Sequence, residues 1–419
     1  MDRQAYSEAV ESATNQRLGG KEFRFPVGGI SDAVSESRLA GFCTSAAFNV
    51  LFRIPHKLSE NGGTRPGLSA VNATLKPAHP SDVIYRDRLV TWDGSVWMIS
   101  RTGKHDDFDF GGDSGDPTRA TSGNVALAGT SGESITAAIP VNDRFLFVAT
   151  RRAIRMIVGE PTAAAVHLSD GIGVISRDAW CFDGISRVWF IGENGLYAMN
   201  LGEPPVLVTQ HLRDTLAGRE SATLVHDPYR NGIHILNSSE DAFFDIENSA
   251  YWPMSYNFAF RPVSGGSAIV NGVNQAVFLC ADGAQRRWDE SADTDDGVAI
   301  KSAVAMGPVV HTTGDTEQAF LAEVDLGFAA DSSHVNVSLY TGKTAADSEE
   351  LARTAVCAVA SGSEPTGDKM RYSVGSGGWN KVLRPRVRCN SFAFVVWSTN
   401  GRWRFSKITA VHRGCGRIR

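Results

Sequence analysis

A hairpin pattern that recurs through the middle of the chain constrains the fold most strongly. Five segments each combine an apolar strand, a short polar turn and a second strand, which is the pattern of a β-hairpin. They begin at Arg88, Arg144, Arg187, Gly232 and Gln275, and the last four starts are 43, 45 and 43 residues apart. A hairpin that returns about every 40–45 residues is typical of a β-propeller, in which each blade is a small four-stranded sheet.

The strands themselves fit this fold, because runs such as "FLFVAT" and "VWFIG" are apolar without alternation. Continuous apolar runs are expected where both faces of a strand are buried, as in the inner strands of packed blades. We expect a sixth blade to combine Ala47–Arg53 with Val298–Val304. The sequence therefore predicts five to six blades.

The period is lost from about Gly307. Six later segments have the pattern of strands in a separate antiparallel sandwich, with Asn400-Gly401 as the turn of its last hairpin. The predicted fold is all-β, with an N-terminal arm (1–24), a β-propeller (25–306) and a C-terminal antiparallel β-sandwich (307–419). Helices are expected only at Met1–Arg17 and Gln210–Ala217. The six strand segments are Phe320–Phe328, Val335–Tyr340, Arg371–Val374, Lys381–Cys389, Phe392–Ser398 and Arg402–Ala410.

Charge is distributed unevenly along the chain. The whole chain carries −5, whereas Met370–Arg419 contains eleven Lys or Arg and no Asp or Glu, so the first 369 residues carry −16. An acidic body with a basic end indicates contact with a polyanion, or assembly of like chains end against body.

The basic end supplies the candidate site residues. Arg384, Arg386 and Arg388 alternate, which places them on one face of one strand, and Arg402 and Arg404 share a face in the same way. The segment is free of acids, although both signs normally mix on a solvated face. We interpret these five arginines as facing an interface or an anion, which is either an acidic protein surface or nucleic acid.

Motifs that would carry catalysis are absent from the sequence. It has no GxSxG, HExxH or Walker loop, and its six cysteines form no CxxC or zinc-type spacing. Asp106–Asp116 and Asp293–Gly297 are acidic, but a solvated loop is favoured over a calcium site in both. Arg151, Arg152 and Arg155 could clamp an anionic substrate, although a solvated turn is favoured. We expect no enzyme activity, catalytic residue, metal or cofactor.

Several segments resemble the tail nozzle and neck hub proteins of short-tailed bacteriophages, also called packaged-DNA stabilisation proteins. Ala47–Leu68 is similar to the family's opening, where an Asn-Val segment leads to an Arg-Pro-Gly turn. Tyr85–Phe110 is similar to its first blade, and Asn142–Gly159 with Gly171–Met199 to its next two. Trp403–Arg419 is similar to its basic, glycine-containing terminus. The chain departs from the family in being short, which leaves open whether it is a terminal nozzle or a hub below the portal.

The resemblance implies a structural virion protein in the tail or neck. Such a protein forms a ring, expected to be a hexamer, that continues the DNA channel, retains the packaged genome and passes it during ejection. Its partners would be other copies of itself, the portal or adaptor, further tail proteins and non-specifically the passing duplex DNA, with no membrane. It would be assembled in the host cytoplasm, which agrees with the polar N-terminus. Two alternatives stay open: a propeller glycosidase or glycan-binding protein, and a propeller scaffold or DNA-binding module.

Overall fold

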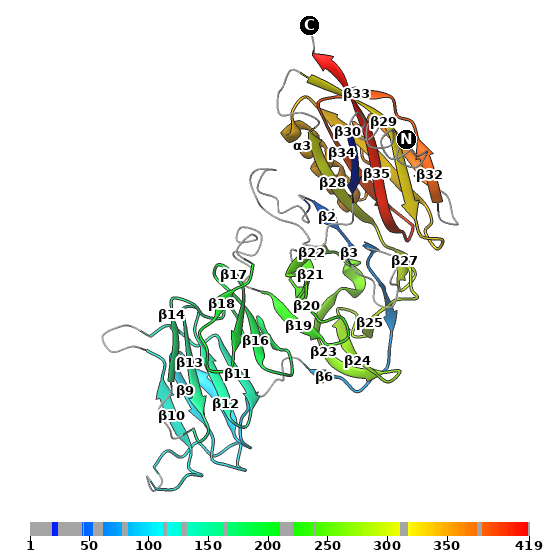
Figure 1. Ribbon diagram of the computed structural model, residues 1–419. Coiled ribbons are helices and arrows are strands. Elements are labelled where there is room, and N and C mark those ends of the chain that lie inside the picture. The colour runs from blue at the N-terminus through cyan, green and yellow to red at the C-terminus, as the bar shows by residue number, and fades with distance from the viewer. Residues whose placement is uncertain are drawn as a thin grey trace, which may run out of the picture. The chain divides into compact units, whose positions relative to one another are not determined.

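The computed structural model describes residues 19–23, 44, 46–52, 62–77, 83–111, 115–126, 132–161, 166–209, 221–237, 240–310, 317–374 and 379–417. Almost all regular structure in these residues is β-strand (Figure 1), which confirms the predicted all-β class. The chain divides into two compact units, and each is described by itself. Unit 1 contains Met1–Ser69, Ala250–Asn257 and Trp288–Arg419, and unit 2 contains Ala70–Ser249 and Phe258–Arg287. The sequence predicts two boundaries, after residues 24 and 306, whereas unit 1 takes three separate stretches of chain.

All five predicted hairpins form as antiparallel strand pairs. In the first, the turn residue Gly94 has a φ of +57°, a left-handed conformation that glycine adopts without strain. The five pairs are β8 (Leu89–Asp93) with β9 (Val96–Ile99), β12 (Phe145–Ala149) with β13 (Ala153–Val158), β16 (Arg187–Gly192) with β17 (Gly195–Asn200), β20 (Gly232–Leu236) with β21 (Asp241–Asp245), and β24 (Val273–Cys280) with β25 (Gln285–Asp289).

One strand precedes each hairpin and pairs with its first strand. In the first three sheets a further strand follows, so that four strands lie in chain order. The preceding strands are β7 (Val83–Ile84), β11 (Ala137–Asn142), β15 (Trp180–Phe182), β19 (Thr223–Asp227) and β23 (Pro262–Val270). The following strands are β10 (Thr121–Asn124), β14 (Val166–Asp170) and β18 (Val206–Leu207). β6 (Lys76–Pro77) pairs with the outer side of β23, and a 3-10 turn, η3 (Phe258–Phe260), precedes β23.

These sheets are the blades of the predicted propeller. Within unit 2 the preceding strands lie against one another, with β7 against β11, β15 against β19, and β19 against β23. Every residue of β20 and β21 is buried. A strand can be buried throughout only if both of its faces are covered, and neighbouring blades provide that cover.

Unit 1 contains the β-sandwich. One sheet has the order β2-β28-β34-β30-β31, and the other has the order β3-β4-β35-β29-β32, to which β1 adds beside β35 and β33 beside β29. The first sheet consists of β2 (Ala47–Phe48), β28 (Ser302–Val310), β34 (Ser391–Ser398), β30 (Val335–Gly342) and β31 (Met370–Val374). The second consists of β1 (Gly19–Phe23), β3 (Val50–Phe52), β4 (Gly62–Thr64), β35 (Arg404–Arg417), β29 (Glu317–Phe328), β32 (Trp379–Leu383) and β33 (Val387–Cys389). Unit 1 also holds β22 (Ala250–Met254), the pair β26 (Thr294–Asp295) and β27 (Val298–Ala299), and most of β5 (Gly67–Ala70).

Two connections differ from the sequence prediction. Asn400-Gly401 does not close a hairpin, because β34 and β35 lie in different sheets and the turn carries the chain from one sheet to the other. The pairing expected between the segments near residues 47 and 303 does form, with Ala47 opposite Val304 and Phe48 opposite Ala303. It belongs to the first sandwich sheet and not to a sixth blade.

The sequence prediction missed the helix α3 (Ala345–Ser361). Thr344 and Asp347 form a capping box at its start, and Gly362, at φ 88°, ends it with a left-handed residue. Its buried face packs on the strands β28, β30 and β34. The residues of this face are Ser348, Ala352, Ala355, Val356 and Val359, and the four apolar ones join a core cluster that includes Tyr340 and Trp397.

We expect Thr344→Ala to lower the free energy of unfolding by about 1 kcal/mol. The Thr344 Oγ1 accepts a hydrogen bond from the Asp347 N–H (3.2 Å), and the Asp347 carboxylate accepts one from the Thr344 N–H (3.0 Å). Alanine leaves the Asp347 N–H without its acceptor. Urea unfolding followed by circular dichroism measures the loss, with Thr344→Ser as the control that retains the hydroxyl. Equal midpoints for the two variants would show that the cap does not stabilise the helix.

Both helices that the sequence predicted, Met1–Arg17 and Gln210–Ala217, lie outside the described residues. A search of the described part of the chain found no helix with the length and apolar character needed to cross a membrane.

Candidate functional site

Three of the five predicted site arginines lie along one margin of the second sandwich sheet. β29 pairs with β35 on one side, so β32 and β33 both lie on its other side, one after the other. Arg384, Arg386 and Arg388 are exposed there, as predicted, while the intervening Pro385 is buried. β32 ends at Leu383 and β33 begins at Val387, so Arg384 and Arg386 lie in the connection between two strands and not within one strand. We call these three arginines the basic edge.

The fold places an acid beside the basic edge, although the sequence segment has none. The Nε of Arg384 lies 3.4 Å from Oε1 of Glu323 on β29, and both side chains are largely exposed. An exposed pair of this kind contributes only about 0–1 kcal/mol. Among the residues that the structure describes, Arg386 and Arg388 have no ion-pair partner. The basic edge therefore keeps most of its positive charge.

The other two predicted arginines lie near carboxylates of their own unit and away from the basic edge. Arg404 is 1% exposed and forms an ion pair with Asp331, so it does not lie on the outward face that the alternation predicted. The pKa of Arg402 is lowered by burial and by the neighbouring charge of Arg404, against the opposing effect of nearby carboxylates. Arg404 is therefore buried and paired, and Arg402 is partly buried near the same carboxylates. The alternation failed here because Asp331 comes from a distant segment of the chain.

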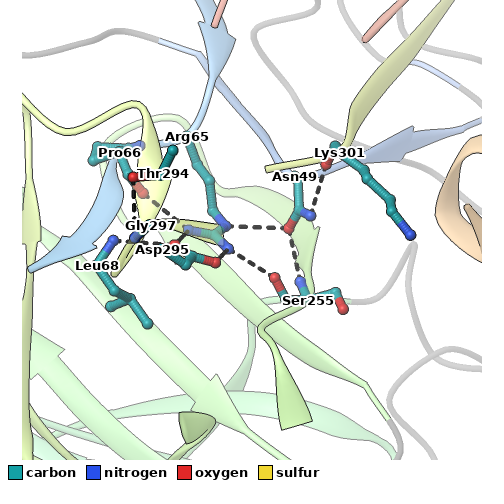
Figure 2. Close-up of polar contacts among 9 residues, drawn as sticks. All are labelled: Asn49, Arg65, Pro66, Leu68, Ser255, Thr294, Asp295, Gly297 and Lys301. Carbon is teal, nitrogen blue, oxygen red and sulfur yellow. Dashed lines mark hydrogen bonds and ion pairs between the residues drawn. The ribbon is translucent and has the colours of Figure 1, made fainter. Parts of the chain in front are cut away.

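The segment that carries the opening of the family resemblance forms a buried polar cluster in unit 1 (Figure 2). Arg65 is 1% exposed and binds the Asp295 carboxylate with both terminal nitrogens, at 2.8 and 2.5 Å. Its Nε donates to Asn49 Oδ1 (3.2 Å) and its Nη2 to the Ser255 carbonyl (2.8 Å), and its guanidinium lies over the Tyr256 ring. The Arg-Pro-Gly turn therefore joins three other segments of the chain. We call the cluster of Asn49, Arg65, Ser255 and Asp295 the clamp.

Asn49 connects this cluster to two further backbone groups, at Lys301 and Ser255. Its backbone has a φ of 51°, a region in which asparagine is favoured among side-chain-bearing residues. Its amide donates to the Lys301 carbonyl (2.8 Å), and its Oδ1 accepts from the Ser255 N–H (2.7 Å) (Figure 2). The Asp295 carboxylate also accepts from the Leu68 N–H (3.0 Å). Every polar group of this clamp is therefore used within the fold.

A pocket of about 370 Å³ opens in unit 2 where the strands that precede four successive hairpins meet. We call it the first-strand pocket. Its walls are Pro140 and Val141 of β11, 180–184 at β15, Val225 and His226 of β19 with the adjacent Pro228, Gly266 and Ser267 of β23, and Asn274 of β24.

Asp183 and His226 both line this pocket, and the charge of Asp183 acts on the His226 imidazole. The Asp183 Oδ1 accepts three backbone N–H bonds, from Ile185 (2.8 Å), Ser186 (2.9 Å) and Arg187 (3.0 Å). Burial lowers the pKa of His226, although the charges of Asp227 and Asp183 oppose the shift. His226 is therefore a neutral imidazole at pH 7, able to donate one hydrogen bond and accept another.

The sequence did not single out the first-strand pocket, although a signal was present. Its wall residues near 140, 181, 225 and 266 follow the same period as the hairpins and precede each of them by a few residues. They are separated along the chain, and no local motif marks them.

The remaining candidates from the sequence do not converge on one site. Arg151 and Arg152 are exposed in the β12–β13 turn, whereas Arg155 is nearly buried, with its Nη1 3.7 Å from Asp170. No group of three or more metal-ligating side chains occurs among the residues described, which include most of Asp106–Asp116 and all of Asp293–Gly297.

Comparison with known proteins gives no family assignment. The chain matches no protein-family model, and a search of curated proteins found no match. Among solved structures it is similar to an exo-β-1,3-galactanase from Phanerochaete chrysosporium, with 9% identity over 81% of this chain and 100% of that one, at a TM-score of 0.25. It is also similar to PorZ of the Porphyromonas gingivalis type-IX secretion system, with 13% identity over 58% of this chain and 31% of that one, at 0.27. A third is the extracellular domain of a putative one-component system of B. thetaiotaomicron, with 9% identity over 84% and 60%, at 0.25. Likenesses this distant carry no argument about function.

Proposed function

We propose that this protein is a structural component of a phage virion, a tail nozzle or head-to-tail hub that assembles into a ring. The ring, a hexamer by the family resemblance, continues the DNA channel below the portal, retains the packaged genome and passes it during ejection. Its partners are further copies of itself, the portal or adaptor, and neighbouring tail proteins. The observation that carries the proposal is the basic edge, a row of three exposed arginines on a chain whose first 369 residues carry −16.

Charge of this kind suits a ring of identical subunits. In a head-to-tail contact, one surface of a subunit meets a different surface of its neighbour, and the ring closes when the rotation between subunits closes. The basic edge of one subunit can then lie against an acidic surface of the next. Complementary charge accelerates such an encounter and excludes wrong orientations.

The buried clamp around Arg65 supports the same proposal in a different way. The resemblance to the family's opening depends on the Asn-Val segment and the Arg-Pro-Gly turn, and Asn49 and Arg65 meet in one hydrogen-bonded cluster. The two separate segments that carry this part of the resemblance are therefore held together in the structure by the same hydrogen-bonded cluster. A shared structural clamp is what two proteins of one fold would retain.

A duplex-DNA ligand is the competing interpretation of the basic edge. Arginines that bind phosphate add affinity at every step along the duplex, which opposes sliding through a channel. We therefore assign the basic edge to contact with protein. The assignment is tested by one set of variants that separates the two roles.

We expect the triple change of Arg384, Arg386 and Arg388 to glutamate to prevent ring formation. The charge of the edge changes from +3 to −3, a difference of six units at each contact, so attraction becomes repulsion. Mass photometry of the protein, alone and with the portal-side proteins of its own virion, measures the oligomer. The matched control changes Arg144, Arg151 and Arg187, which are exposed in unit 2, to glutamate and alters the net charge equally.

Two results would contradict the proposal. One is a parent protein that stays monomeric with its portal-side partners present. The other is a basic-edge variant that still forms rings but loses salt-dependent binding to duplex DNA, which would make these arginines phosphate ligands.

A further inference from the structure

The first-strand pocket carries an inference that is independent of the ring. Its position is set by the fold, because four strands from four hairpin repeats contribute to one hollow. Pockets of a few hundred Å³ with mixed apolar and polar walls are the usual form of small-molecule sites. We propose that this pocket binds a neutral carbohydrate, with Asp183, His226, Ser267 and Asn274 hydrogen-bonding its hydroxyl groups.

The polar side chains around the pocket have capacity left for a ligand. Among the residues that the structure describes, the side chains of His226, Ser267 and Asn274 have no hydrogen-bond partner. Asp183 uses Oδ1 for the turn that follows β15, and among the described residues its Oδ2 accepts no hydrogen bond. These four side chains offer both donors and acceptors, and a sugar hydroxyl is itself donor and acceptor.

The charge of the walls selects against an anion. None of the lining residues is a lysine or an arginine, so a phosphate, a nucleotide or an acidic sugar would meet no cation. The Asp183 carboxylate would repel such a ligand further. Its charge is offset by the three backbone N–H groups on Oδ1, so a cation is not required either. A neutral ligand suits a pocket whose lining has no lysine or arginine and whose one carboxylate is already hydrogen-bonded.

The apolar walls suit the carbon face of a sugar ring. Trp180 and Phe182 alternate on β15, so both side chains lie on one face of that strand. Pro140, Val141 and Pro228 complete the apolar lining. Aromatic and apolar walls with a few placed polar groups are the common composition of pockets that orient a small ligand.

A second hollow of unit 2, of about 540 Å³, lies near Arg86 and Arg88. Its charges are already used, because Arg86 pairs with Glu160 at 2.5 Å and Arg88 donates to the Arg119 carbonyl at 2.9 Å. A ligand there would have to break these contacts. A ligand in the first-strand pocket would not have to break ion pairs of this kind.

Isothermal titration calorimetry on the full chain tests the proposal. The neutral arm contains glucose, galactose, mannose, N-acetylglucosamine and their disaccharides, and the anionic arm contains sialic acid, glucuronic acid and a nucleoside monophosphate. We expect binding in the neutral arm only. Asn274→Ala should weaken it about tenfold, the effect of losing one or two good hydrogen bonds. Val273→Ala, the neighbouring residue outside the pocket, is the matched control and should bind as the parent does.

Three outcomes would overturn the inference. Absence of heat with every neutral sugar would remove the ligand class, and stronger binding in the anionic arm would replace it with another. A sugar whose affinity is unchanged in both Asn274→Ala and His226→Ala would bind elsewhere on the chain. The basic-edge glutamate variant should bind sugar as the parent does, so failure of the ring and failure of the pocket are distinguishable.

Discussion

The Arg65→Ala variant is expected to lose about 3–5 kcal/mol of unfolding free energy, which is the typical cost of removing one partner of a buried ion pair. The Asp295 carboxylate would remain buried without the two nitrogens that now lie 2.8 and 2.5 Å from it. The Asn49 Oδ1 and the Ser255 carbonyl would each lose a donor as well. A loss this large is a substantial part of the stability of an ordinary domain.

Denaturant unfolding followed by circular dichroism and tryptophan fluorescence measures this loss. Arg384→Ala is the matched control, because its pair with Glu323 is exposed and should contribute about 0–1 kcal/mol. Replacing Arg65 with Met and Asp295 with Leu together should recover much of the stability, since no lone charge is then left buried. If Arg65→Ala unfolds at the same denaturant concentration as Arg384→Ala, the clamp does not stabilise unit 1.

The repeating hairpins could be predicted from the sequence because the residues that specify each hairpin are close together along the chain. Each strand, turn and second strand lies within about 20 residues, a range in which apolar patterns and turn residues act directly. The same period also locates the first-strand pocket. Wall residues such as Trp180 and His226 precede their hairpins by similar distances, so a closer use of the repeat would have found them.

The missed helix α3 was also within reach of sequence analysis. Thr344 and Asp347 have the spacing of a capping box, and Gly362 follows the last apolar residue at the position of a helix end. The buried positions Ala352, Ala355, Val356 and Val359 follow the helical period. The sequence analysis assigned only strands to this part of the chain and left these residues without an element.

Long-range contacts could not be obtained from the sequence. Arg65 and Asp295 are 230 residues apart, and nothing near either residue indicates the other. Alternation of its neighbours predicted Arg404 on an outward face, but its side chain is buried and forms an ion pair with Asp331. Similarly, Asn400-Gly401 has the residues of a hairpin turn, yet the chain changes sheet there. Alternation identifies the two faces of a strand, but which face is covered depends on distant segments.

A second buried cluster predicts how the stability of unit 2 depends on pH. Asp227 is fully buried and accepts hydrogen bonds from the Tyr229 N–H (3.1 Å), the Arg230 Nη1 (3.1 Å) and the Ala276 N–H (3.3 Å). His234 lies beside it, with Nε2 3.5 Å from Oδ2. Burial alone would raise the pKa of Asp227, but the hydrogen bonds from His234 and Arg230 and the charge of Arg230 outweigh this effect and lower that pKa.

The pKa values of two histidines in this region are lowered in the folded chain, so acid destabilises the fold. Burial lowers the pKa of His234 and of His226 below the ordinary value of about 6.5. As the pH falls below about 6.5, the unfolded chain therefore takes up protons that the folded chain does not, and stability falls. The lowered pKa of Asp227 adds a second loss once the pH falls below about 4, where the unfolded carboxyl is protonated first.

We therefore expect the unfolding free energy of the parent to decrease in two steps with acid, and Asp227→Ala to cost about 3–5 kcal/mol at neutral pH. The alanine variant leaves the Arg230 guanidinium buried without this carboxylate, and its second acid step should be smaller than that of the parent, with the other carboxyls of lowered pKa still contributing. His234→Phe, which keeps the ring packed between Phe243 and Phe278, should make the first step shallower, with His226 still contributing. Thermal unfolding at several pH values between about 3 and 8 measures both steps. A parent whose melting temperature stays constant from neutral pH down to about 4.5 would contradict the histidine step, because two buried neutral imidazoles must lose stability over that range.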